Sequence, residues 1–141
     1  MENSSRIKNL IRESALTAGY LWSKGWAERN AGNISVNITD MLHEEAPGFQ
    51  PAASAFVLNK PYPGLAGESF LITAAGTRMR DLANDPLNNV VLITIGENGT
   101  HYTLKSGIQT ECRDLLPTSE LPTHLEIHQM IVRRHSGEKV V

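Results

Sequence analysis

The sequence predicts an α/β fold in which amphipathic helices pack against a sheet that is at least partly antiparallel. Three observations lead to this prediction. Apolar residues recur at helical spacing near both ends of the chain, short apolar segments lie between them, and two of those segments flank a turn typical of a hairpin. The chain has 141 residues, the usual size of one domain. We therefore expect a single domain over residues 1–141.

The first predicted element is a helix that begins at Ser4 and ends before Gly25. An Asn- and Ser-rich segment suited to an N-cap lies at its start. The apolar residues that follow keep near-helical spacing and form one face, which should pack on a sheet: Ile7, Leu10, Ile11, Ala15, Ala18, Leu21 and Trp22.

The next segments predict strands separated by a long irregular stretch. Residues 34–38 alternate apolar and polar side chains, which is the period of a half-buried strand. Residues 40–67 are rich in Pro, Ala and Gly and predict a long excursion with one short strand at residues 55–58. Residues 70–73 predict a buried strand.

A hairpin is predicted from residues 90–95 and 100–104, because these apolar segments flank the turn Glu97-Asn98-Gly99. The last predicted helix opens with the run Pro117-Thr118-Ser119-Glu120-Leu121-Pro122. Its expected capping-box pair is Thr123 with Glu126, and it should end near Ser136-Gly137. Residues 138–141 resemble the first residues of a further strand, so we expect the chain to be a fragment of a longer domain.

Composition restricts the possible partners. The formal net charge is -2 and charged residues make up 20% of the chain, so neither nucleic acid nor an acidic membrane is an expected partner. No apolar run approaches the ~20 residues that span a bilayer. The single cysteine, Cys112, cannot form an internal disulfide, and the N-terminus has no secretion-signal pattern. We therefore expect a cytoplasmic protein.

Three turns share a composition suited to anion binding. They are Asn30-Ala31-Gly32-Asn33, Thr73-Ala74-Ala75-Gly76-Thr77 and Pro117-Thr118-Ser119-Glu120. Small residues let backbone N–H groups approach an anion, hydroxyl and amide groups add donors, and a helix N-terminus attracts negative charge. Each turn taken singly is an ordinary turn or cap. A phosphate site follows only if the three converge in space.

Glu120 and two histidines near it have alternative roles. Glu120 is either an acidic residue at a helix N-terminus or a catalytic base. His124 and His128 are spaced to share one helix face, where histidines are more often core residues than zinc ligands, although a pair at this spacing can bind zinc.

Taken together, three runs resemble the class II aldolase family, in particular its rhamnulose-1-phosphate type. They are Gly25-Trp26-Ala27-Glu28-Arg29-Asn30-Ala31-Gly32-Asn33-Ile34-Ser35, Ile72-Thr73-Ala74-Ala75-Gly76-Thr77 and Pro117-Thr118-Ser119-Glu120-Leu121-Pro122-Thr123-His124. The resemblance implies a three-layer α/β/α fold around a mostly antiparallel sheet. It also implies a cyclic homotetramer with active sites near the subunit boundaries.

The resemblance also implies an activity, the cleavage of L-rhamnulose 1-phosphate to dihydroxyacetone phosphate and L-lactaldehyde with the help of zinc. Glu120 would be the catalytic acid/base. The substrate phosphate would be held by Asn30, Asn33, Thr118, Ser119 and the backbone of Ala75 and Gly76. Because relatives commonly have a serine where this chain has Ala75, a hydroxyl donor is missing from the second turn.

Zinc is expected in the intact enzyme but not in this chain alone. The family's ligands are a His-x-His pair expected just past Val141 and a third histidine further on. Two alternatives remain: a sugar-phosphate 4-epimerase of the same superfamily, and a non-catalytic aldolase-like module that binds another protein.

Overall fold

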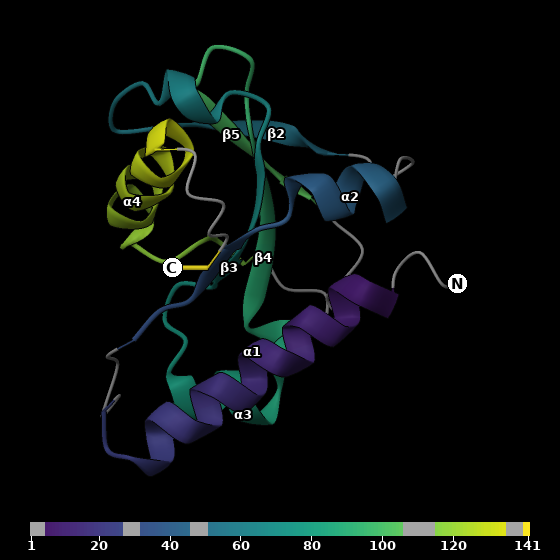
Figure 1. Ribbon diagram of the computed structural model, residues 1–141, viewed down its shortest axis with the longest axis vertical. Helices are drawn as coiled ribbons and strands as arrows, with labels where there is room; N and C mark the ends of the chain where they lie inside the picture. The colour runs from purple at the N-terminus through teal and green to yellow at the C-terminus, as the bar shows by residue number, and fades with distance from the viewer. Residues whose placement is uncertain (1–4, 27–31, 46–50, 106–114, 135–139) are drawn as a thin grey trace.

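The protein folds around a five-stranded sheet with helices on both sides (Figure 1). This computed structural model describes residues 5–26, 32–45, 51–105, 115–134 and 140–141. The strand order is β1-β3-β4-β5-β2, and each neighbouring pair is antiparallel. The predicted α/β class and the antiparallel sheet are therefore confirmed.

The helices and strands have the following bounds. The strands are β1 (Ser35–Asn37), β2 (Pro51–Val57), β3 (Ser69–Thr73), β4 (Val90–Ile95) and β5 (His101–Lys105). The α-helices are α1 (Ser5–Ser23), α2 (Thr39–Glu45), α3 (Met79–Asn84) and α4 (Leu121–Arg134), and two short 3₁₀ helices are η2 (Pro63–Leu65) and η3 (Pro86–Asn88).

The sheet separates two hydrophobic clusters. Side chains of a strand alternate between its faces, so along β4 the buried Leu92 belongs to one cluster and its neighbour Ile93 to the other. The first cluster lies under α1, α2 and α3, and the second under α4 and η2. Figure 1 shows α1 and α3 side by side, with α4 set apart from them. This arrangement is the three-layer α/β/α fold that the resemblance implies.

The segment that the sequence predicted as mostly irregular contains the helices α2 and η2 and a longer strand than expected. Residues 40–67 were expected to contain one strand at residues 55–58, yet α2 lies within them and β2 begins at Pro51. The Asn37 side chain accepts hydrogen bonds from the Thr39 N–H (3.0 Å) and hydroxyl (2.6 Å), which starts α2. Like α3, α2 has too few turns to display a helical period in the sequence.

The predicted capping box of the last helix is wrong. Helix α4 begins at Leu121, so Thr123 lies inside its first turn. Thr118 holds the turn that leads into the helix: its carbonyl accepts a hydrogen bond from the Leu121 N–H (3.0 Å), and its hydroxyl accepts one from the Glu120 N–H (3.3 Å). The carbonyl of Glu120, the residue before the helix, accepts from the His124 N–H. Glu126 instead forms an ion pair with Lys60. The helix ends at Arg134, and the end expected near residues 136–137 lies outside the described residues.

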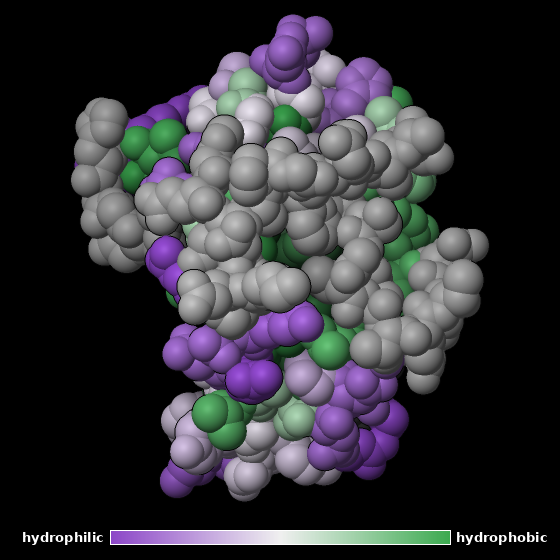
Figure 2. All heavy atoms as spheres, turned by 90° about the vertical axis from the view of Figure 1, so that its right-hand side faces the viewer, coloured by the Kyte–Doolittle hydropathy of each residue, from purple (hydrophilic) through white to green (hydrophobic). Residues whose placement is uncertain are grey.

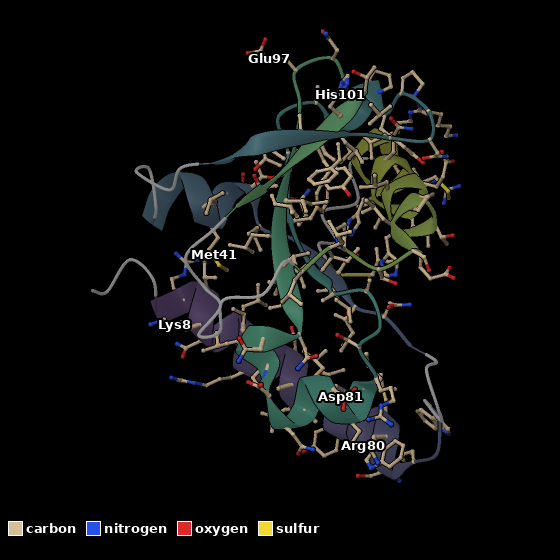
Figure 3. All side chains as sticks on the ribbon, turned by 180° about the vertical axis from the view of Figure 1, so that it is seen from behind. Lys8, Met41, Arg80, Asp81, Glu97 and His101 are labelled. Carbon is tan, nitrogen blue, oxygen red and sulfur yellow. The ribbon has the colours of Figure 1, made fainter. Side chains whose placement is uncertain are left out.

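The hairpin between β4 and β5 is confirmed. Gly99 has a φ of 70°, and its N–H donates to the Gly96 carbonyl at 2.9 Å. Figure 3 shows Glu97 and His101 at this end of the molecule, with Asp81 at the opposite end.

The last residues of the chain extend the sheet beyond β1. Val140 bridges Val36, and Val141 and Ser35 exchange two backbone hydrogen bonds of 2.8 Å. Residues 140–141 therefore pair as the predicted strand requires, while residues 138–139 lie outside the described part of the chain.

The surface agrees with the polar composition. Figure 2 shows hydrophilic side chains at both ends of one face. Within the described ranges, no helix combines the length and the apolar character needed to cross a membrane.

Candidate active site

Two of the three candidate turns and the start of β1 meet at Thr73, a fully buried residue at the end of β3. The Ile34 N–H, directly after Asn33, donates to the Thr73 hydroxyl at 2.8 Å, and the Thr73 N–H donates to the Ile34 carbonyl at 3.0 Å. The Thr73 carbonyl accepts from the Thr118 N–H at 2.9 Å. One threonine therefore joins the ends of the first and third turns to the second.

A second seam runs between the second and third turns. Ala74 and Pro117 form an antiparallel bridge, and the Ala75 N–H donates to the Leu116 carbonyl at 2.8 Å. The second and third turns therefore lie side by side, and Ile34, the residue after Asn33, is bonded to the second. Asn33 itself lines a cavity on the α1 side, with Ser14 and Thr17. Asn30 lies outside the described residues.

Of the site residues suggested by the sequence in the second and third turns, all but one face solvent here. Ala75, Gly76, Ser119 and Glu120 are exposed, whereas Thr118 is buried. The Ala75 N–H is occupied by Leu116, so it is a poor candidate donor to a ligand. Gly76 has a φ of 75°, and a Cβ there would meet nothing within 4 Å. In the second turn, Gly76 is therefore the accessible backbone position.

Glu120 is the residue directly before α4. Its carbonyl accepts from the His124 N–H at 3.2 Å and its N–H donates to the Thr118 hydroxyl, so both sides of its backbone are held. Its side chain is exposed beside the second and third turns, where a ligand can reach the carboxylate.

His124 and His128 lie on the buried face of α4, and both contact Ser35. The Ser35 hydroxyl lies 2.6 Å from His124 Nδ1 and 2.8 Å from His128 Nε2. Burial lowers the pKa of His124 below its ordinary value of 6.5, and the Glu120 carboxylate partly opposes this shift. Both rings are thus hydrogen-bonded interior groups, in agreement with the core interpretation of these histidines.

The described residues do not form a zinc site on their own. No three His, Cys, Asp or Glu side chains within the described ranges lie together so as to hold a metal ion. His124 and His128 each direct one ring nitrogen to Ser35. Zinc would need further ligands from outside the described residues.

A cavity of about 380 Å³ borders the second turn on the side of α3. Its lining includes the carboxylates of Asp81 and Asp85, and the pKa of Asp81 is held below its usual range chiefly by hydrogen bonds from Arg78. A phosphate is disfavoured beside these charges. Because Gly76 also lines this cavity, a phosphate bound at Gly76 has to lie away from these two side chains.

Sequence reasoning missed two residues that organise the site, Thr73 and Ser35. Both residues lie in predicted strands and in the runs that carry the family resemblance, but neither of them was assigned a role in the site from the sequence. The sequence did contain a signal for both residues: each places a hydroxyl in a predicted strand. If the strand is buried, that hydroxyl needs a hydrogen-bond partner from another segment.

Comparisons with known proteins show the family of this chain. Residues 12–136 match the family described as "Class II Aldolase and Adducin N-terminal domain". The chain is 37% identical over 139 residues to the rhamnulose-1-phosphate aldolase of Bacteroides thetaiotaomicron, covering 99% of this chain and 50% of that protein. It is 32% identical over 118 residues to the enzyme of the same name from Klebsiella pneumoniae subsp. pneumoniae, covering 83% and 42%.

A solved structure is similar as well. The sugar-phosphate aldolase from Thermotoga maritima superposes with a TM-score of 0.75 at 33% identity, covering 96% of this chain and 52% of that one. The chain thus spans about half the length of the relatives named here. Since the family match covers most of the sequence and the fold agrees, the chain belongs to the class II aldolase and adducin N-terminal domain family.

Proposed function

We propose that this chain supplies the phosphate site and the acid/base residue of a zinc-dependent aldolase. The reaction is the cleavage of L-rhamnulose 1-phosphate to dihydroxyacetone phosphate and L-lactaldehyde. The observation that carries the proposal is the meeting of two small-residue turns at Thr73, next to Ile34 and beside the exposed Glu120. The relatives called rhamnulose-1-phosphate aldolase supply the choice of substrate.

The substrate phosphate is held by Asn30, Asn33, the Gly76 backbone, Thr118 and Ser119. The Ala75 N–H, which the sequence prediction included, donates to the Leu116 carbonyl instead. Gly76 and Ser119 are exposed, and Thr118 fixes the turn that carries Ser119. These donors are neutral. A neutral cradle holds the phosphate while leaving the developing charge of the reaction to another part of the site.

Glu120 transfers the proton at carbon. When the C3–C4 bond of the ketose breaks, the C4 hydroxyl releases its proton to water and becomes the carbonyl of the leaving aldehyde. The electron pair of the broken bond stays on C3 of the dihydroxyacetone phosphate fragment as an enediolate, and Glu120 takes up its proton from water before it acts as an acid. Glu120 in its acid form donates a proton to that carbon, and in the condensation direction its carboxylate removes the proton. Both steps require the carboxyl group within about 3 Å of C3.

Zinc belongs to the intact enzyme in this proposal. When bound, a metal of this kind polarises substrate oxygens and stabilises the enediolate. Its expected ligands are a His-x-His pair and a further histidine. Since these 141 residues contain no His-x-His pair, we expect them alone to bind no zinc and to lack activity. Metal analysis of the isolated chain tests this point.

Replacing Glu120 by glutamine tests the proposal. In the protein produced from the complete reading frame and supplied with zinc, Glu120→Gln should lower kcat for L-rhamnulose 1-phosphate by about 10²–10⁴-fold with a small change in KM. The matched control is Glu97→Gln, because Glu97 follows β4 at the end opposite Thr73. Equal rates in parent and Glu120→Gln would refute the assigned role, and a parent with no aldol cleavage would refute the function.

A 4-epimerase and a protein-binding module are the alternatives. The first would use the same enediolate chemistry, and the matched family's description includes adducin as well as aldolases. Product analysis separates the three: two smaller products indicate an aldolase, an isomeric sugar phosphate an epimerase, and neither product a binding module.

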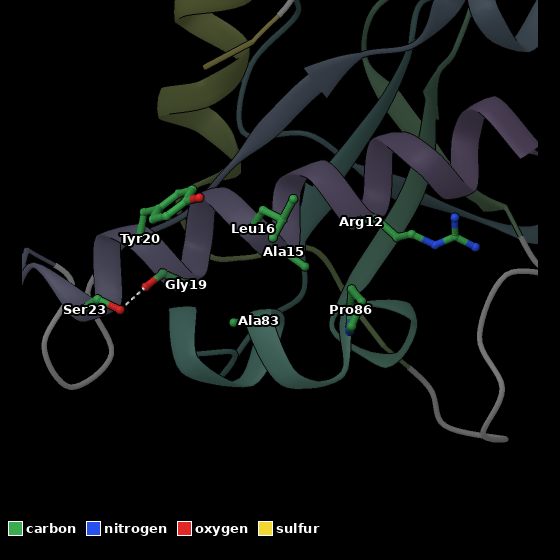
Figure 4. A pocket seen from close by; sticks show the side chains of 8 residues that line it. All are labelled: Arg12, Ala15, Leu16, Gly19, Tyr20, Ser23, Ala83 and Pro86. Atoms are coloured by element: carbon green, nitrogen blue, oxygen red, sulfur yellow. Dashed lines mark hydrogen bonds between the residues drawn. The ribbon is translucent and has the colours of Figure 1, made fainter.

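We further propose a cytoplasmic homotetramer. On α1, Leu16 is 62% exposed and Tyr20 70% exposed, and they border a groove of about 580 Å³ between α1 and the α3–η3 segment (Figure 4). Large exposed apolar side chains on one helix suit a subunit contact. Light scattering of the intact protein tests the tetramer.

A further inference from the structure

Ser35 is a buried polar residue aimed at α4. It is 1% exposed and is the first residue of β1. Its neighbour Val36 belongs to the cluster under α1, so Ser35 points to the opposite face of the sheet, where α4 packs. His124 and His128 are one helical turn apart on the buried face of α4 and approach the same hydroxyl oxygen.

The hydrogen bonds restrict the protonation of the two rings. A serine hydroxyl has one proton to donate and lone pairs that accept, and a neutral imidazole has one donor and one acceptor nitrogen. If Ser35 donates to His124 Nδ1, then His128 Nε2 must donate to Ser35, and both rings carry their proton on Nε2. If the direction is reversed, both rings carry it on Nδ1. The two neutral rings therefore share one tautomer.

The same count of hydrogen-bond donors and acceptors excludes a state in which both imidazole rings are protonated. Two imidazolium groups would both donate to Ser35 and leave its proton without either ring as acceptor. They would also place two positive charges in the interior, at costs that burial makes large. The network is complete only when at least one ring is neutral.

These hydrogen bonds connect the two segments that carry the proposed phosphate-binding and acid/base residues. Ser35 lies two residues after Asn33 and directly after Ile34, which is bonded to Thr73. His124 donates its backbone N–H to the Glu120 carbonyl. The side-chain bonds thus tie the start of β1 to the first turns of α4, and through the backbone to Glu120.

We infer that Ser35, His124 and His128 are positioning residues, which set Glu120 and the Ser119 turn relative to Asn33 through a neutral hydrogen-bonded bridge. This inference rests on the proposed function and deepens it. The three side chains act by fixing the place of the catalytic carboxylate, and a displacement of about 1 Å in such a group can lower the rate about a hundredfold.

Replacing the histidines by asparagine or glutamine tests the hydrogen-bonded bridge with side chains that carry no charge. Asparagine places an amide near the position of Nδ1 and glutamine near that of Nε2, and an amide offers both a donor and an acceptor. His124→Asn and His128→Gln are therefore the matched variants, and His124→Gln and His128→Asn are the mismatched ones. Ser35→Ala removes a single oxygen atom and serves where a histidine variant fails to fold.

In the intact zinc-loaded protein, the matched variants should retain kcat within about threefold, while the mismatched variants and Ser35→Ala lose about tenfold to a hundredfold. KM for the sugar phosphate should change less than kcat, since the phosphate donors are not removed. Mismatched variants and Ser35→Ala with parental kcat would overturn the inference. If the histidines served only for packing, there would be no reason for asparagine to be the better replacement at His124 and glutamine the better one at His128.

Two measurements need no turnover. Imidazole ¹⁵N chemical shifts at neutral pH should show the same tautomer for His124 and His128, and different tautomers would overturn the bridge. Amide exchange at Leu121 and His124 should quicken in Ser35→Ala and the mismatched variants but not in the matched ones. If the parent has no aldolase activity while these results hold, the proposed function fails and the positioning bridge stands.

Discussion

Thr73 is a polar residue without measurable exposure, and its hydrogen bonds account for that position. Its hydroxyl accepts from the Ile34 N–H at 2.8 Å and donates to the Ile34 carbonyl at 3.1 Å, while its own carbonyl accepts from Thr118. A buried hydroxyl is tolerated only when it is paired in this way. At the scale of single residues, the site thus depends on interior polar groups more than on the residues that would touch a ligand.

Replacing Thr73 by valine should reveal this dependence. The shape is kept, but the Ile34 N–H loses its side-chain acceptor, so we expect the free energy of unfolding to fall by about 1–3 kcal/mol. Exchange of the Ile34 amide should also quicken.

Thr94→Val is the matched control for that measurement. The Thr94 hydroxyl lies 2.8 Å from the Ser69 hydroxyl, and Thr94 is half-buried. Its replacement should cost less, and an equal loss at both positions in urea unfolding would contradict the importance given to Thr73.

The pKa of His124 predicts how stability depends on pH. Because burial lowers the pKa of the folded state below 6.5, the unfolded chain binds more protons over the range between the two values. The contribution of His124 is therefore complete above about pH 6.5 and is lost as pH falls toward the folded-state pKa.

Urea unfolding at pH 7.5 and at lower pH, for the parent and for His124→Asn, measures this contribution. The parent should lose more stability than the variant on acidification, because asparagine does not titrate. Parallel pH profiles would mean that His124 has the same pKa in the folded and unfolded states.

At the scale of elements, turns decide which segments come together. The β4–β5 turn packs against η2: the Gly99 carbonyl accepts from the Tyr62 N–H at 2.8 Å. A Cβ on Gly99 would lie 2.5 Å from the Tyr62 carbonyl oxygen, closer than real contacts allow. The turn residues in the sequence predict a positive φ at Gly99. Only the packing against Tyr62 and Pro63 explains why no side chain fits there.

Gly99→Ala should therefore be strongly destabilising. The positive φ alone costs roughly 1–2 kcal/mol for a residue with a Cβ. The clash with backbone atoms of Tyr62 and Pro63 adds to that cost, since they belong to a packed segment.

Gly67→Ala separates the two contributions. Gly67 has a φ of 78°, and a Cβ there would meet nothing within 4 Å, so only the backbone cost applies. Thermal unfolding should show a clearly larger loss for Gly99→Ala. Similar losses in the two variants would indicate that the turn moves away from Tyr62 without cost.

At the scale of the whole molecule, one sheet supplies both hydrophobic clusters. Leu92 and Ile93 are adjacent on β4, both fully buried, and belong to opposite clusters. Since a loss on either face disturbs the same strand, we propose that residues 1–141 form one cooperative unit.

Leu92→Ala and Ile93→Ala test this unity. Each should lower the free energy of unfolding by about 2–5 kcal/mol, and each should leave a single transition. Both tryptophans lie at α1, Trp22 within it and Trp26 just after it, so their fluorescence reports that layer while far-UV circular dichroism reports all layers. Different midpoints for the two signals in either variant would show that the layers unfold separately.

The sequence by itself determined the long helices, the hairpin and the fold class. These features depend on apolar periodicity and on turn residues, and both can be read within one continuous segment of the sequence. It also determined the family resemblance and the candidate residues, because Pro117-Thr118-Ser119-Glu120 and its companion turns are contiguous runs.

Only the tertiary structure decided which of those residues meet. The turn that leads into α4 is held because Thr118 is anchored to Thr73, and the Ala75 N–H is occupied because Leu116 lies beside it. Ser35 contacts His124 and His128, some ninety positions later, because β1 packs beneath α4. Hydrogen bonds and burial between distant segments have no period in the sequence, so the site was predictable in its parts while its geometry was not.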